Sequence, residues 1–328
     1  MDFTAAVAAV LTFILGMLCG RENGSSLAVA LAVITTWILA TRATTHRYVE
    51  ALSETDILDT LKMAIIALVI YPLLPDTPLD PYGVLNPREI WLMVVLVSLI
   101  GYIGYILIRI LGTERGLSLT GILGGLVSST AVTTAMAEEV KVNKEVMSSA
   151  VFATVVASCT RFQRMLFIVL VLNRGLFMKL LPSLLAMTAI GLVLAYLSLR
   201  GDGAIKKDLQ VKDPFRILPA LEFGAFFAIV LLASKVASLY FGDTGIYAAS
   251  LVAGLADVDA ITLSMATLAK TTLAENIAVR SIMLASMTNT VVKLIIAFLL
   301  GNREFGRRIA MTFLPMLAVG IAVALLLT

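Results

Sequence analysis

Two carboxylates lie inside an apolar segment of this chain. The stretch from Gly254 to Thr262 reads GLADVDAIT, which places Asp257 and Asp259 two residues apart in an otherwise apolar run from about 246 to 268. An apolar helix of about 20 residues is long enough to span a bilayer. Because a carboxylate at membrane depth is costly, it normally faces a cavity, a pathway or a charged partner. The two aspartates therefore predict a functional site within a membrane.

A second stretch resembles the first at a constant spacing of 129 residues. It runs from Gly125 to Thr133 and reads GLVSSTAVT. The two stretches align without a gap, and similar residues recur at the same spacing from about 116 to 173. We interpret this as an internal repeat that has hydroxyl groups in one copy and carboxylates in the other. A chance likeness between two apolar helices rich in small residues is the alternative, and the relative direction of the copies stays open.

Glycines in both copies predict helices that break at membrane depth. Gly124, Gly125 and Gly254 permit a change of backbone direction. Ser128, Ser129 or Thr130 in the first copy and Asp257 in the second are residue types that cap helix N-termini. The N–H groups of a broken helix favour an anion, and its carbonyl groups favour a cation. Close helix packing through small residues also explains the glycines, but it does not explain the aspartates.

The apolar segment that follows each motif carries positive charge. Arg161 and Arg164 are three residues apart, and Asn289 and Lys293 are four apart, so each pair shares one helix face. An ion pair of Asp257 or Asp259 with Lys293 or Arg161 would offset the cost of burial. We predict that the substrate or ion pathway is formed by Ser128, Ser129, Thr130, Thr133, Asp257, Asp259, Thr262, Arg161, Arg164, Asn289 and Lys293.

The two aspartates are expected to play different roles. Residues i and i+2 point about 200° apart on a regular helix, so the two carboxylates cannot chelate one ion unless the backbone breaks. We expect Asp257 to cap a half-helix and only Asp259 to reach the pathway. If all the charged groups named above are ionised, positive charge exceeds negative by one, which can accept an anion.

Composition identifies the class of protein. The 328 residues are 59% hydrophobic and 14% charged, whereas soluble domains have about 25% charged residues. We predict an all-α integral membrane protein of 10 to 11 transmembrane helices with broken helices near Gly125 and Gly254. The expected spans are 3–20, 26–42, 57–74, 89–111, 117–138, 146–172, 177–199, 217–240, 246–268, 275–300 and 309–327. Residues 1–328 should form a single transmembrane domain with halves 1–173 and 174–328 and a polar linker at about 200–216.

Soluble-enzyme chemistry finds no support in these residues. There is no glycine-rich phosphate loop followed by Lys-Ser/Thr, and no Ser/His/Asp set. His46 is the only histidine, which excludes a metal site built from several histidines. We expect no enzymatic activity and no cofactor, and the sequence does not identify a metal ligand set.

Three segments carry a resemblance to a known family: NPREIWLM at 86–93, GGLVSSTAVT at 124–133 and GLADVDAIT at 254–262. Over nearly its whole length, the chain resembles a prokaryotic polytopic membrane family of unknown function that is often fused C-terminal to MgtC/SapB-type domains. The resemblance implies a multi-pass protein of the inner membrane, and the fusion suggests a link to magnesium or ion homeostasis. The Ser-Ser-Thr-Ala element at 128–131 also resembles, over a short stretch, the broken-helix motif of Kef-type cation/proton antiporters.

These features predict a membrane transporter. The first hypothesis is a secondary carrier of an inorganic ion or small charged solute, with proton coupling as one option. An ion channel and a non-transporting membrane regulator linked to magnesium homeostasis are the alternatives. The expected partners are the lipid bilayer, a small ion or charged solute and a second copy of the chain in a homodimer, without nucleic acid. The expected location is the inner (cytoplasmic) membrane.

Overall fold

A computed structural model describes residues 3–20, 28–29, 31–33, 35–36, 54–111, 117–198 and 217–327. Every element in these ranges is a helix. The chain divides into two compact units, Met1–Asp56 and Ile57–Thr328. The first unit contains α1 (Phe3–Cys19). The predicted span 26–42 lies largely outside the described residues, as do His46 and the linker 200–216. That the chain is a single transmembrane domain stays a prediction.

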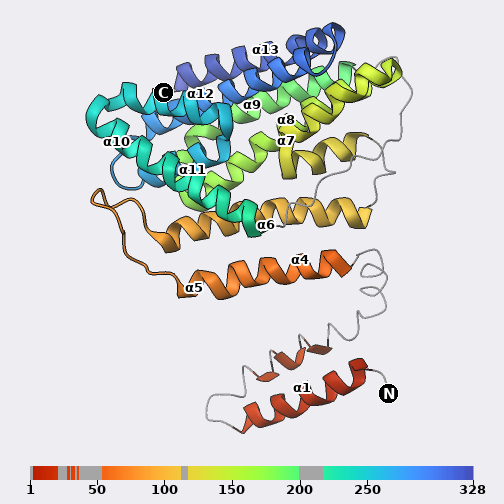
Figure 1. Cartoon of the computed structure of the whole chain (residues 1–328), viewed down its shortest axis with the longest axis vertical. Coiled ribbons are helices and arrows are strands. Elements are labelled where there is room, and N and C mark those ends of the chain that lie inside the picture. The colour runs from red at the N-terminus through yellow and green to blue at the C-terminus, as the bar shows by residue number, and fades with distance from the viewer. Residues whose placement is uncertain are drawn as a thin grey trace. The chain divides into compact units, whose positions relative to one another are not determined.

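The second unit is a bundle of apolar helices (Figure 1). It contains α4 (Glu54–Ala64), which begins at the boundary between the units, η1 (Ile65–Ile70), α5 (Tyr71–Leu73), α6 (Pro87–Leu111), α7 (Leu117–Val142), η3 (Lys144–Val146), α8 (Met147–Leu172), α9 (Arg174–Ser198), α10 (Ile217–Ala256), α11 (Val258–Leu268), α12 (Glu275–Leu299) and α13 (Arg303–Leu327). Among the described residues, six helices are long and apolar enough to cross a membrane, namely α6, α8, α9, α10, α12 and α13. The prediction of an all-α, multi-pass membrane protein is confirmed.

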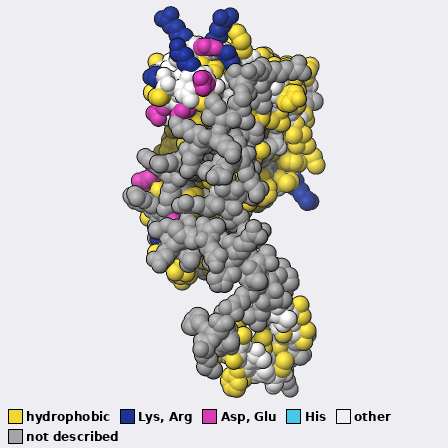
Figure 2. Space-filling view, turned by 90° about the vertical axis from the view of Figure 1, so that its right-hand side faces the viewer, with side chains coloured by type: hydrophobic (Ala, Val, Ile, Leu, Met, Phe, Trp, Pro, Cys, Tyr) yellow, Lys and Arg dark blue, Asp and Glu magenta, His cyan; other side chains and the backbone are white. Residues whose placement is uncertain are grey.

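Hydrophobic side chains cover much of the bundle surface. Figure 2 shows such an area on one face, with Lys, Arg, Asp and Glu side chains gathered toward the top of the view. The exposed apolar side chains come from several of the long helices and include Phe167, Met178, Tyr196, Leu239 and Leu299. In water this surface would be unfavourable, whereas lipid tails solvate it well.

The chain reverses direction in the middle of α7. Ser128 has an extended backbone (φ −161°, ψ 103°), and it separates the half-helices 117–127 and 129–142. A Cβ placed on Gly124 would lie 2.6 Å from Cγ2 of Val132, eight residues later, so the two half-helices fold back on each other. This is the first hairpin, and its tip is the stretch 128–130.

The second hairpin has the same construction. Asp257 is extended (φ −150°, ψ 125°) and separates the end of α10 from α11. A further kink at Gly242 (φ 56°) divides α10 into 217–241 and 243–256, and a Cβ on Gly245 would collide with the carbonyl oxygen of Ala237. The second hairpin is therefore 243–268, with its tip at 257–259. The predicted breaks near Gly125 and Gly254 are confirmed, three residues beyond each glycine.

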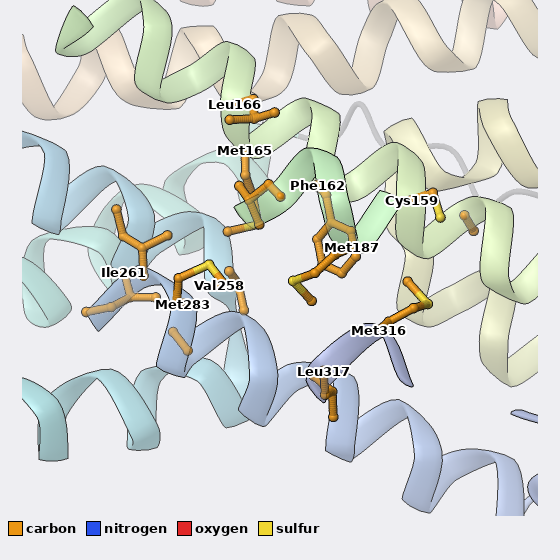
Figure 3. Packing of buried hydrophobic residues seen from close by; sticks show 14 of the residues in the cluster. Cys159, Phe162, Met165, Leu166, Met187, Val258, Ile261, Met283, Met316 and Leu317 are labelled. Carbon is orange, nitrogen blue, oxygen red and sulfur yellow. The ribbon is translucent and has the colours of Figure 1, made fainter. Parts of the chain in front are cut away.

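The repeat extends further than the sequence indicated. Gly191 in α9 lies against the side chain of Met316 in α13, and Gly320 in α13 lies against Met187 in α9. Both pairs obey the spacing of 129 residues, so α9 and α13 pack reciprocally, as a pseudo-twofold axis requires. Met187 and Met316 are labelled among the buried residues in Figure 3. The repeat units are thus α6–α9 and α10–α13. In this division α9 belongs to the first repeat, and the predicted division of the chain into halves at 173 stays a prediction.

The two hairpins open at opposite ends of the bundle. Asn302, just after α12, donates to the carbonyl oxygen of Val140, near the link between α7 and α8. The link between α11 and α12 lies at the other end of α8, where Lys179 pairs with Glu275 at 2.9 Å. Figure 1 shows the α7–α8 link on the right and the kink in α10 on the left. The repeats are therefore inverted. The predicted count of 10 to 11 spans exceeds the six candidate spans among the described residues. Part of the difference arises because the prediction counts the hairpins at 117–138 and 246–268 as spans.

Candidate functional site

A cavity of about 250 Å³ lies where the two hairpin tips meet. Its walls come from both tips, from α8 and from α6, and they consist of Val97, Gly125, Val127, Ser128, Ser129, Thr130, Arg161, Arg164, Ala256, Asp257 and Asp259. Seven of the predicted pathway residues line it. Two stretches 129 residues apart thus form one site, and this is the juxtaposition that the repeat predicted.

Each tip caps its own second half-helix. The hydroxyl oxygen of Ser128 accepts from the backbone N–H of Ala131 at 3.2 Å. Oδ1 of Asp257 accepts from the backbone N–H of Asp259 at 2.6 Å. These are N-cap interactions at equivalent positions. Because both half-helices begin at the cavity, their positive dipole ends lie at its walls.

One carbonyl group at the end of each first half-helix accepts a bond from a side chain. Nη1 of Arg164 donates to the backbone oxygen of Leu126 at 2.7 Å, and Nδ2 of Asn289 donates to that of Gly254 at 3.2 Å. One carbonyl group at each of these ends thus has a protein donor, and the amide ends of the second half-helices, which favour an anion, lie at the cavity.

A buried ion pair joins the two repeats. Nη2 of Arg164 on α8 lies 2.9 Å from Oδ2 of Asp259 on the second tip, with 7% and 11% of the two side chains exposed. Nε of Arg164 and Oδ1 of Asp259 have no hydrogen-bond partner in the described part of the chain. Asp257 caps its half-helix as predicted, whereas the ion pair uses Arg164 instead of Lys293 or Arg161. Both aspartates line the cavity, and that only Asp259 reaches the pathway stays a prediction. The angular argument assumed a regular helix, and the backbone breaks at Asp257.

Lys293 makes the reciprocal contact from the second repeat. Its side chain is buried, and Nζ lies 2.8 Å from the hydroxyl oxygen of Ser129 on the first tip. A second hydroxyl, that of Ser158 on α8, lies 3.2 Å from the same nitrogen. Each repeat therefore directs a cation from its long helix to the tip of the opposite hairpin. Ser158 was not predicted, although its position three residues before Arg161 on one helix face was the available signal.

The remaining predicted residues have supporting or separate positions. Arg161 donates to Oδ1 of Asn289, which links α8 to α12 beside the cavity. Thr133 donates back to the carbonyl oxygen of Ser129 at 2.8 Å and does not line the cavity. Thr262 is fully buried, and its hydroxyl has no partner among the described residues. These two threonines stabilise the hairpins or pack within them.

A second cavity adjoins the first at Arg164. It has a volume of about 150 Å³ and lies between α4, α6 and α10, with Lys62 and Phe223 in its wall. Val97, Val127 and Arg164 line both cavities. The Arg164 side chain therefore lies in the walls of both cavities. Within the described ranges, no group of three or more His, Cys, Asp or Glu residues is arranged to hold a metal ion.

The glycines before each tip permit direct backbone contact. A Cβ on Gly125 would lie 2.7 Å from the carbonyl oxygen of Ala157, and a Cβ on Gly254 would lie 2.7 Å from that of Ala285.

We expect Gly125→Ala to destabilise the protein by about 1–3 kcal/mol, because α7 and α8 must move apart. Thermal unfolding in detergent would measure the loss. Gly101→Ala is the matched control, since nothing lies within 4 Å of its Cβ position; equal midpoints for the two variants would contradict the packing described.

Comparison with known proteins identifies relatives without a described activity. A family model described as "Domain of unknown function (DUF4010)" matches residues 95–301, which include both hairpins and the helices that follow them. A protein of Aquifex aeolicus, described only as uncharacterized, is 31% identical over 192 residues, covering 57% of this chain and 84% of the relative. No solved structure matches the chain.

Proposed function

The chain belongs to the DUF4010 family, and we propose that it is a secondary carrier that moves a small charged solute through the cavity between its hairpin tips. The observation that carries this proposal is the meeting of two inverted, equivalent hairpins at one cavity lined with buried charges. Inverted repeats with broken helices that meet at a central site are the construction of many secondary transporters.

The symmetry of the site supports alternating access. The two hairpins open at opposite ends of the bundle, so each supplies a gate between the cavity and one side of the membrane. The Arg164–Asp259 ion pair connects α8 of the first repeat to the tip of the second. Breaking this pair would free one hairpin from the other repeat. Proton coupling, a homodimeric assembly and the cytoplasmic membrane as location stay predictions.

The link to magnesium stays a prediction from family resemblance. A divalent cation prefers several oxygen ligands. The carbonyl oxygens of Leu126 and Gly254 already accept bonds from side chains, and Asp259 is engaged by Arg164. This arrangement favours a solute other than a bare divalent cation.

Transport by purified protein in proteoliposomes tests the proposal. Solid-supported-membrane currents would be recorded for a panel of inorganic ions and small charged metabolites, with and without a pH gradient. We expect a saturable current that falls at least about tenfold in Asp259→Asn, which corresponds to about 1.4 kcal/mol or more. Asp243→Asn is the control, because this carboxylate is exposed at the kink in α10, away from the cavity.

Three results would overturn the proposal that the protein is a carrier. Unitary conductance steps would indicate a channel. Transport by Asp257→Asn and Asp259→Asn at the parental rate, with both variants folded, would place the pathway elsewhere. The absence of flux for every solute in the panel, with the protein folded and incorporated, would favour a non-transporting role.

A further inference from the structure

The pseudo-twofold relation leaves one of two equivalent positions without an anionic partner. In one position, the cation Arg164 meets the carboxylate of Asp259. In the other, the hydrogen-bond partners of Lys293 in the described part of the chain are the hydroxyl groups of Ser129 and Ser158. The hairpin tips are equivalent in backbone and in capping, but only the second tip carries carboxylates.

The charges around the cavity do not balance when all are ionised. Arg161, Arg164 and Lys293 contribute three positive charges, and Asp257 and Asp259 contribute two negative ones. Lys293 is 1% exposed, so water does not solvate its ammonium group. A buried charge without a counter-ion is expensive. If all five of these groups are ionised, the site as a whole therefore attracts one further negative charge.

The first tip has the donors that an anion needs. The first N–H groups of a helix have no partner within the helix, and Ser128 caps only that of Ala131. Ser129 and Thr130 both line the cavity, so this half-helix begins at the cavity wall. An independent observation points the same way: Arg164 lines this cavity, is 8% exposed, and its Nε–H has no acceptor in the described chain.

We propose that the first tip, Ser128–Thr130, binds a small monovalent anion of the carboxylate or inorganic oxyanion type. The anion occupies the place that the Asp259 carboxylate holds in the other repeat, and Lys293 supplies its counter-charge through Ser129. The proposal names the substrate class of the carrier proposed above and rests on that function. Asp257 and Asp259 in the same cavity disfavour a divalent anion. A water occupies about 30 Å³ in the liquid, so a cavity of about 250 Å³ accepts a solute of only several heavy atoms.

The test is binding to the detergent-purified full chain, measured without transport. The probes are sodium acetate and sodium lactate as organic anions and sodium nitrate as an inorganic one, in a Tris-sulfate buffer. Choline sulfate serves as the cation control. We expect acetate, lactate or nitrate to raise the midpoint of thermal unfolding in a saturable manner, and carbon-13 acetate to show line broadening that the competing anions remove. Tighter binding of acetate or lactate would identify the ligand as an organic carboxylate, and tighter binding of nitrate would identify it as an inorganic anion.

Variants assign the binding to the first tip. Ser129→Ala and Thr130→Ala should each raise the apparent dissociation constant at least about tenfold. Ser183→Ala should not change it, because Ser183 is a buried serine in α9 that does not line the cavity. Lys293→Gln should abolish binding; if that variant fails to fold, the two tip variants still decide the question. Equal affinity in Ser129→Ala, Thr130→Ala and the parent would overturn the proposal, as would stabilisation by choline alone.

Binding and transport fail in distinguishable ways. Anion binding at the tip without flux in proteoliposomes would support this site and overturn the carrier. Saturable flux of a cation, with no anion binding in detergent, would keep the carrier and overturn the anion site.

Discussion

Asp259→Ala is expected to lower the free energy of unfolding by about 3–5 kcal/mol, because it leaves the Arg164 guanidinium buried without its counter-charge. The two charged groups are 2.9 Å apart, and 11% or less of either side chain is exposed. Arg164 would retain its bond to the Leu126 carbonyl, which cannot neutralise it. Denaturant or thermal unfolding in detergent micelles would measure the loss.

An exposed ion pair in the same bundle provides the matched control. Arg308 and Glu304 are 2.7 Å apart, with 40% and 59% of their side chains exposed. Glu304→Ala should cost no more than about 1 kcal/mol, since solvent screens such pairs. The double variant Arg164→Met, Asp259→Leu should recover most of the stability lost in Asp259→Ala while transport stays low. Losses of similar size in Asp259→Ala and Glu304→Ala would show that the inner pair is solvated and does not hold the tip.

Much of the candidate site could be predicted because charged side chains at membrane depth are rare. Asp257 and Asp259 are unusual in an apolar run, and the repeat pointed from them to Ser128–Thr130. Arg161 and Arg164 followed because buried carboxylates need counter-charges. The contacts that depend on backbone atoms could not be predicted in this way. The carbonyl groups of Leu126 and Gly254 accept side-chain bonds only because the chain breaks just beyond them.

The topology was harder to predict than the site, for a physical reason. A hairpin of two half-helices and one straight span contain similar numbers of apolar residues, so hydropathy alone counts 117–138 and 246–268 as crossings. The sequence also did not reveal that Met187 packs on Gly320 and Met316 on Gly191. Methionine in a bundle is ordinary, and only the glycine that each side chain covers reveals the relation between α9 and α13.

The inverted arrangement predicts that the two hairpin exits face opposite sides of the membrane. Lys144, after the first hairpin, and Lys270, after the second, are both exposed. We would introduce Lys144→Cys or Lys270→Cys into a chain whose Cys19 and Cys159 are replaced by alanine. A membrane-impermeant maleimide added to sealed vesicles of known orientation should label each cysteine from one side only, and the two sides should differ.

Arg303→Cys supplies the internal control. Arg303 lies next to Asn302, which bonds to Val140 at the end of the first hairpin, so it should be labelled from the same side as Lys144→Cys. Three crossings, α8, α9 and the 217–241 part of α10, separate the two hairpins, and an odd number of crossings exchanges the sides. Labelling of Lys144→Cys and Lys270→Cys from the same side would make the repeats parallel. In that case both hairpins would open to one compartment, and the site between their tips would lose its second gate.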